Sequence, residues 1–118
     1  MREGREQREW IRIAVDLPAK YRIIDGPARY DIMRIVDIHH RGGCFQAAQH
    51  LSKGEKVRII LEIPFEGQVN FTAEVAWCFP MNDEDDYRTG VKFIVDGPQA
   101  EENCHKLYHF CLLQQPKG

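Results

Sequence analysis

The sequence predicts an all-β fold, a small six-stranded antiparallel β-barrel with a C-terminal α-helix over one flank or mouth. Three observations support this prediction. Apolar and polar residues alternate in about six or seven short runs, which is the period of strands with one buried face. Turn residues separate these runs at hairpin spacing. The last segment changes to a helical period, and closure of the sheet would hide its edges.

Length and composition indicate one globular domain. The 118 residues are 43% hydrophobic and 29% charged, which is enough for a single modest core. The formal net charge of −2 argues against a protein that coats nucleic acid, because such binding requires a net basic surface. No apolar run has the length of a signal peptide or a membrane span. We therefore expect a soluble cytoplasmic protein that does not insert into membranes, with a monomer as the simplest assembly.

The N-terminal segment, residues 1–9, carries alternating charges and is expected to be a flexible arm that leads into the barrel domain, residues 10–114. Apolar residues then alternate over 11–17, the pattern of a half-buried strand. Pro18 predicts an edge or a kink at that point. The chain is expected to resume as a strand over 21–24.

Turn residues divide the rest of the chain into further strands. Gly42 and Gly43 are adjacent, and such a pair supplies a sharp or left-handed turn. The expected extended segments are 30–38, 44–47, 57–63, 69–77 and 90–95, with turns at 25–27, 41–43 and 66–67.

A single amphipathic helix is predicted over about 97–113. Pro98 follows a glycine at a first helical position, and Glu101 and Glu102 lie in the early turns, where they favour the helix dipole. Apolar residues recur at helical spacing through Cys104 and Cys111. The four cysteines contain no C-x-x-C pair, so we expect reduced, buried thiols rather than disulfides; they are Cys44, Cys78, Cys104 and Cys111.

Two short motifs indicate a ligand that contains guanine and phosphate. Arg8 and Arg12 stand at the start of the first strand, and Asp37 opens a D-x-x-x-x-G turn that ends at Gly42. The guanidinium fork matches phosphate oxygens and the O6/N7 edge of guanine. A carboxylate can accept from the N–H groups of guanine. These residues together suit both halves of a guanine nucleotide.

The chain also contains a hairpin that ends in Val-x-Trp and a Gly-Val-x-Phe strand. Together with the two motifs above, these features resemble the PilZ domain family, and the resemblance extends from Arg8 to about Leu113. PilZ domains are six-stranded β-barrels that act as receptors for the bacterial second messenger cyclic di-GMP, and they are binding modules rather than enzymes. The resemblance implies that Arg8 and Arg12 contact guanine edges and phosphates. It also implies that Asp37 and Gly42 shape the second wall of the site, with no cofactor besides this ligand.

His39 stands where the family has serine. An imidazole is bulkier than a hydroxyl, and it can either block the ligand or donate a hydrogen bond to it, more strongly when protonated. We expect binding that is retained but altered. Two further residues have two interpretations each. Arg41 is either a phosphate contact or a solvated turn residue. Trp77 is either an aromatic of the core or barrel mouth, or a stacking surface for guanine.

The predicted function is therefore a receptor whose arm is ordered when cyclic di-GMP binds. The ordered arm would signal to a downstream partner protein, which the sequence does not identify. The alternative is a PilZ-like adaptor that has lost the nucleotide and acts through protein contacts. No nucleophile-elbow, P-loop or H-E-x-x-H motif indicates an enzyme. A barrel for single-stranded nucleic acid would need exposed aromatics along a basic groove, whereas most aromatics here occupy inward positions.

A metal site was the remaining alternative, because His105 and His109 are one helical turn apart. On a helical wheel, however, Cys104 and Cys111 share the apolar face with Leu107, whereas the histidines are rotated to its side. Four ligands are not expected to converge there, so no metal is predicted.

Overall fold

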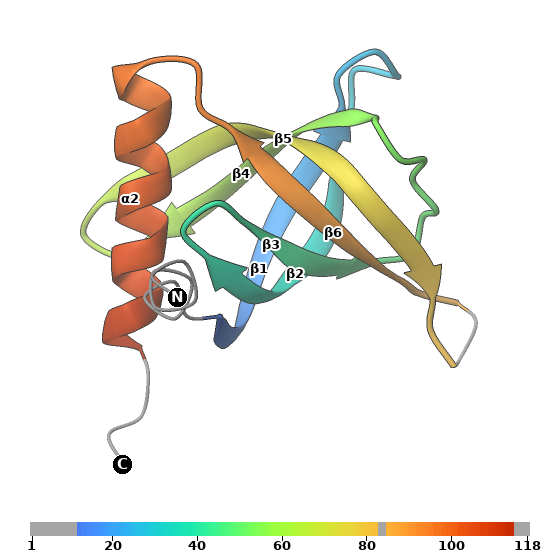
Figure 1. Ribbon diagram of the computed structural model, residues 1–118, viewed down its shortest axis with the longest axis horizontal. Helices are drawn as coiled ribbons and strands as arrows, with labels where there is room; N and C mark the ends of the chain where they lie inside the picture. Colours follow the sequence, from blue (N-terminus) through green and yellow to red (C-terminus); the bar gives the residue numbers. More distant parts are fainter. Residues whose placement is uncertain (1–11, 83–84, 115–118) are drawn as a thin grey trace, which may run out of the picture.

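The computed structural model describes residues 12–82 and 85–114. Six antiparallel strands close into a barrel in the order β1-β2-β3-β6-β5-β4, and one helix lies beside it (Figure 1). The predicted fold class is confirmed. The elements are β1 (Ile13–Ile23), β2 (Asp31–His39), β3 (Gly42–Ala47), β4 (Lys56–Ile63), β5 (Gly67–Pro80), β6 (Tyr87–Ile94) and α2 (Pro98–Leu113).

Strand β1 continues through Pro18, so the predicted separation of 11–17 from 21–24 was wrong, whereas the predicted edge at Pro18 is present. Pro18 pairs with Arg34 of β2, whereas pairing with β4 begins only at Lys20. The side of β1 that faces β4 is therefore an open edge at Pro18, where a residue without an N–H is tolerated.

The core fills the barrel with apolar side chains from all six strands. Tyr21 and Phe45 are its largest fully buried members, and their ring centroids lie 5.5 Å apart. Helix α2 adds Cys104, Leu107 and Cys111 to this core, which confirms the predicted apolar face. All four cysteines are free.

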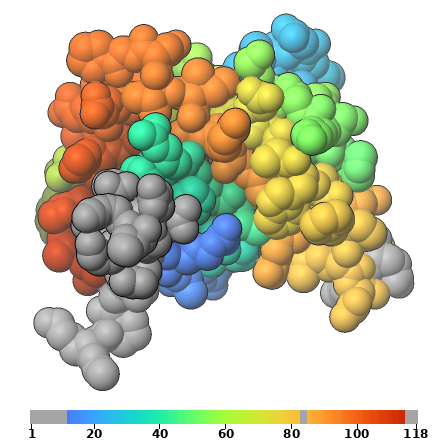
Figure 2. All heavy atoms as spheres, viewed as in Figure 1, coloured from blue at the N-terminus to red at the C-terminus, as the bar shows by residue number. Residues whose placement is uncertain are grey.

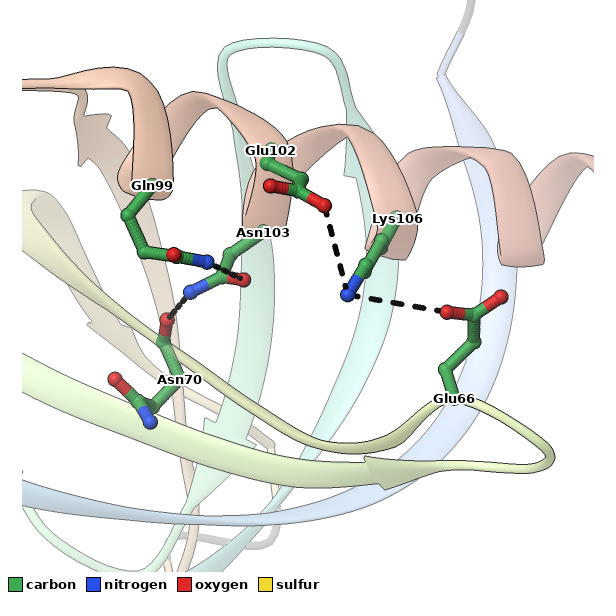
Figure 3. Close-up of polar contacts among 6 residues, drawn as sticks. All are labelled: Glu66, Asn70, Gln99, Glu102, Asn103 and Lys106. Atoms are coloured by element: carbon green, nitrogen blue, oxygen red, sulfur yellow. Dashed lines mark hydrogen bonds and ion pairs between the residues drawn. The ribbon is translucent and has the colours of Figure 1, made fainter.

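Polar contacts fix α2 against the sheet (Figure 3). Asn103 donates from Nδ2 to the carbonyl oxygen of Asn70 at 2.8 Å, and Gln99 donates to Asn103 at 3.2 Å. The ammonium of Lys106 lies 3.9 Å from a carboxylate oxygen of Glu66 in the β4–β5 turn. Within the described residues, no helix combines the length and apolar character needed to cross a membrane.

Gly42 and Gly43 serve close packing rather than a left-handed turn, so the predicted conformation was wrong. Both residues belong to β3, and neither has a positive φ. A Cβ on Gly42 would lie 2.2 Å from the carbonyl oxygen of Val91, and one on Gly43 would lie 2.7 Å from that of Asp37. Only glycine lets β3 approach both neighbours this closely.

Candidate ligand-binding surface

Cross-strand pairing places four residues in one row around the outside of the barrel. Asp37 of β2 pairs with Cys44 of β3, Cys44 with Gly90 of β6, and Gly90 with Trp77 of β5. Ile38, Phe45 and Val91, each next to a residue of this row in the sequence, belong to the core. Figure 2 shows the β2–β3 turn (teal), β6 (orange) and the second half of β5 (yellow) side by side on one face.

Arg12 and Asp37 form an ion pair on this face. The Arg12 Nη1 donates to Asp37 Oδ2 at 3.0 Å, and the two side chains are 59% and 22% exposed. Asp37 points outward because the β2–β3 register shifts between Ile35 and Asp37, which places an additional residue in β2. Its other oxygen, Oδ1, is buried without a hydrogen-bond partner. Asp37 therefore retains an unsatisfied acceptor.

His39 lies next to this pair on the same side of β2. Burial lowers the pKa of His39 below its ordinary value of 6.5, Arg12 lowers it further, and Asp37 opposes both effects. The ring is therefore neutral at neutral pH. The backbone N–H of Arg41 donates to Nδ1 at 3.3 Å. The proton of the neutral ring is therefore on Nε2, which can donate a hydrogen bond to a ligand.

Arg41 holds the β2–β3 turn through its backbone. Besides the bond to His39, its carbonyl accepts a hydrogen bond from the N–H of Phe93 at 2.9 Å. Its side chain is exposed, so contact with a phosphate stays a prediction. Gly42 follows it and pairs with Lys92, which adds another exposed cation beside the row.

Trp77 is not a core residue, so the interpretation of an inward position was wrong. A register shift between Val75 and Trp77 reverses the alternation of β5. After it, Cys78 faces inward, where its Sγ accepts from the buried hydroxyl of Thr89 at 3.2 Å. Trp77 turns outward and stacks on Phe79, with ring centroids 5.2 Å apart. A stacking role toward guanine stays a prediction.

Arg88 is a residue of this surface that the sequence analysis missed. The pKa of the Cys44 thiol is raised to about 11, first by burial and then by Asp37, while Arg88 and Arg12 oppose the shift. The guanidinium groups of Arg88 and Arg12 are thus both close enough to act on Cys44. Strand β6 begins at Tyr87 rather than at the expected Gly90. Extending the alternation back from Gly90 would have placed Arg88 outside.

Arg8 and the predicted arm lie outside the described residues, so their predicted roles are not tested by this geometry.

The side chains of α2 face the directions that the helical wheel predicted. Cys104 and Cys111 are buried, whereas His105 and His109 are exposed. Within the described ranges, no three acidic, histidine or cysteine side chains are placed to hold a metal ion.

Comparison with known proteins agrees with the barrel fold. The family model for the PilZ domain matches residues 6–111. No curated protein matches the chain.

Solved structures with the same fold share little sequence with this chain. The Bacillus subtilis inhibitor of motility MotI/DgrA is 19% identical, with a TM-score of 0.67 over 90% of this chain, which spans 50% of that protein. The PilZ domain of CeSA from a cellulose-synthesising bacterium is 18% identical, with a TM-score of 0.67, and the match covers 84% of this chain and 95% of that domain. The PilZ domain of YcgR from Escherichia coli, solved with cyclic di-GMP, is 14% identical, with a TM-score of 0.67 and coverage of 92% and 93%.

The match over residues 6–111, together with the closed barrel and its C-terminal helix, shows that this chain belongs to the PilZ domain family, a family of cyclic di-GMP receptors rather than enzymes.

Proposed function

We propose that this domain binds cyclic di-GMP on the outer face of β2, β3, β6 and β5. The observation that carries the proposal is the Arg12–Asp37 pair beside the orphaned Oδ1 of Asp37. Arg12 supplies the donor fork for a phosphate or a guanine edge. Asp37 supplies the acceptor for guanine N–H groups, which would satisfy its free oxygen. The ligand held by the structurally similar YcgR domain supports this choice.

The ion pair is a small barrier to binding. Both partners retain exposure to solvent, and such surface pairs contribute only about 0–1 kcal/mol. Hydrogen bonds to charged groups contribute about 1.5–3 kcal/mol each. Cyclic di-GMP can therefore displace the pair if it gives each partner one such bond.

The other predicted residues complete the proposed site. Arg8 contributes the second guanidinium of the R-x-x-x-R motif. His39 donates from Nε2 to a phosphate or to guanine, and Arg41 offers a further cation. Trp77 offers a ring face to a base, where stacking contributes about 1–3 kcal/mol. Gly42 has a structural role instead, because the absence of a side chain lets β3 pack closely against β6.

Binding becomes a signal if the ligand orders the arm over the barrel face. Residues 1–9 are proposed to wrap cyclic di-GMP through Arg8 and to create a surface for a downstream partner. Because cyclic di-GMP is a bacterial second messenger, the proposed setting is the bacterial cytoplasm.

Calorimetric titration with cyclic di-GMP tests the proposal. Wild type should release binding heat, and Arg8→Ala or Arg12→Ala should abolish it. Arg29→Ala is the matched control, because Arg29 also pairs with a carboxylate, Asp31 at 3.7 Å, but lies at the β1–β2 turn. If wild type gives no binding heat but His39→Ser does, the protein is the alternative adaptor that has lost nucleotide binding. No heat in either protein would refute nucleotide binding.

A further inference from the structure

A strained aromatic residue marks a second surface, which shares no residue with the row described above. Phe65 has a φ of 69° and a side chain that is fully exposed, at 107% of its reference area. It is the third residue of the β4–β5 turn, which the N–H of Glu66 closes on the carbonyl of Ile63 at 2.9 Å, with Pro64 in second position. A type II turn favours glycine or asparagine at this third position. Phenylalanine here costs conformational energy and also exposes apolar area to water.

The exposed ring stands at the edge of a groove of about 840 Å³ between the β4–β5 turn and α2. Ile63 and Pro64 form one wall with Phe65. The helix supplies Phe110 and Leu113 to the other wall, and Leu113 is 69% exposed. A groove with apolar walls on an exposed surface is a candidate site for a partner.

The rim of the groove is acidic. Glu66, Glu101 and Glu102 line it together with a single ammonium, that of Lys106. Lys106 lies 3.9 Å from Glu66 and 3.8 Å from Glu102, so its charge is already compensated (Figure 3). Among the described residues, the last turn of α2 contains no basic residue, so no side chain of that turn compensates the negative end of the helix dipole beside Leu113.

We propose that this groove docks a basic amphipathic helix of a partner protein, with Phe65 as the aromatic anchor. The apolar face of such a helix would lie between Phe65 and Leu113, and its lysine or arginine residues would meet the three carboxylates. The same rim disfavours anionic lipid and nucleic acid through charge repulsion. A second copy of this chain is disfavoured as well, because a two-fold contact would set one acidic rim against another.

The probe is a fluorescein-labelled designed helix with leucine at i, i+3, i+4 and i+7 and lysine elsewhere. Its matched control carries glutamate in place of every lysine. Fluorescence anisotropy should rise when wild type is added to the leucine–lysine helix and should not rise with the leucine–glutamate helix. Equal binding of both helices, or no binding of the first, overturns the proposal.

Three variants locate the contact. Phe65→Gly should weaken binding by at least about tenfold, as expected for an aromatic anchor. Glu101→Lys should weaken binding of the leucine–lysine helix and strengthen that of its glutamate control. Tyr30→Ala, which removes another exposed aromatic at the β1–β2 turn, should change neither. Unchanged affinity in Phe65→Gly overturns the proposal.

Further measurements show whether Phe65→Gly affects folding or the nucleotide site, and whether a second copy or lipid occupies the groove instead of a partner helix. Phe65→Gly should fold at least as stably as wild type, because glycine accepts the positive φ without strain, and its calorimetric response to cyclic di-GMP should be unchanged. A dimer seen by sedimentation that Phe65→Gly abolishes would assign the groove to a second copy. Binding to phosphatidylglycerol vesicles that Phe65→Gly abolishes would assign it to lipid. Either result refutes a basic partner helix.

Discussion

The guanidinium of Arg12 lies 3.0 Å from the carboxylate of Asp37, so two residues of the proposed ligand site hold each other. The pair joins the residue just before β1 to the C-terminal part of β2. It keeps both side chains at the position where cyclic di-GMP would need them, while exposure to solvent keeps their attraction weak. The pair thus orients the site at little cost to binding.

Asp37→Asn is the first test of this relationship. The substitution keeps the size of the side chain but removes the charge that Arg12 and guanine N–H groups would share. The affinity for cyclic di-GMP should fall by about ten- to hundredfold, corresponding to the loss of one hydrogen bond to a charged group. The free energy of unfolding should change by less than about 1 kcal/mol. Calorimetry and urea unfolding measure the two effects, and unchanged affinity would exclude Asp37 from the site.

The affinity of wild type for cyclic di-GMP should rise as pH falls. Protonated His39 attracts the phosphates, and these in turn raise its pKa in the complex. Because burial lowers the pKa of His39 in the free protein, the rise should continue below pH 6.5, with a limit of about tenfold per pH unit for one proton. His39→Ser should give a flat profile. A wild-type profile that is also flat would remove His39 from the mechanism.

The same histidine should make the fold less stable in acid. A pKa that is lower in the folded state means that the unfolded chain takes up the proton first, so stability is present above pH 6.5 and is lost as pH falls below it. Burial lowers the pKa of His40 as well, so His39→Ser should remove only part of this pH dependence. Urea unfolding between pH 7.5 and pH 5 measures it, and a variant as sensitive as wild type would contradict the assignment.

Trp77→Ala should weaken cyclic di-GMP binding by about 1–3 kcal/mol if the ring stacks on a base. The stability loss should be modest, because Trp77 stacks outside the core on the exposed ring of Phe79. Trp77→Phe keeps an aromatic face and should retain most of the affinity. Equal loss in both variants would indicate that the indole acts through the packing of β5 on Gly90 instead.

Gly42→Ala should destabilise the barrel strongly, because its new Cβ would lie 2.2 Å from the backbone oxygen of Val91, an atom that cannot move away without disrupting β6. We expect a loss of about 1–3 kcal/mol or more. Gly97→Ala is the matched control, since no atom lies within 4 Å of the added carbon. Thermal unfolding of the two variants should differ clearly, and similar midpoints would contradict the close approach of β3 and β6.

Leu107→Ala should cost about 2–5 kcal/mol of unfolding free energy, because the side chain is fully buried between α2 and the barrel. Leu113→Ala makes the same chemical change at a residue that is 69% exposed and should cost far less. If both variants unfold at the same denaturant concentration, α2 does not pack on the core as described.

Most of the fold was predictable because strand and helix periods are local. The alternation of β4 and the helical spacing of Cys104 and Leu107 each follow from residues only a few positions apart. The error at Trp77 occurs where an additional residue shifts the register. Apolar residues continue on both sides of Trp77, so nothing in the local pattern shows which side turns inward. Only the partner strand settles it, through Gly90.

The sequence by itself determined the all-β class, the approximate positions and order of the strands, the terminal helix and the motif residues of the family, because these depend on short-range period and residue type. Only the tertiary structure decided that Arg12 meets Asp37, that Arg88 joins the same face and that Phe65 stands over an apolar groove beside α2. The physical reason is barrel closure. Contacts between residues tens of positions apart depend on how all six strands register against one another, and a single shift moves a side chain from one face to the other.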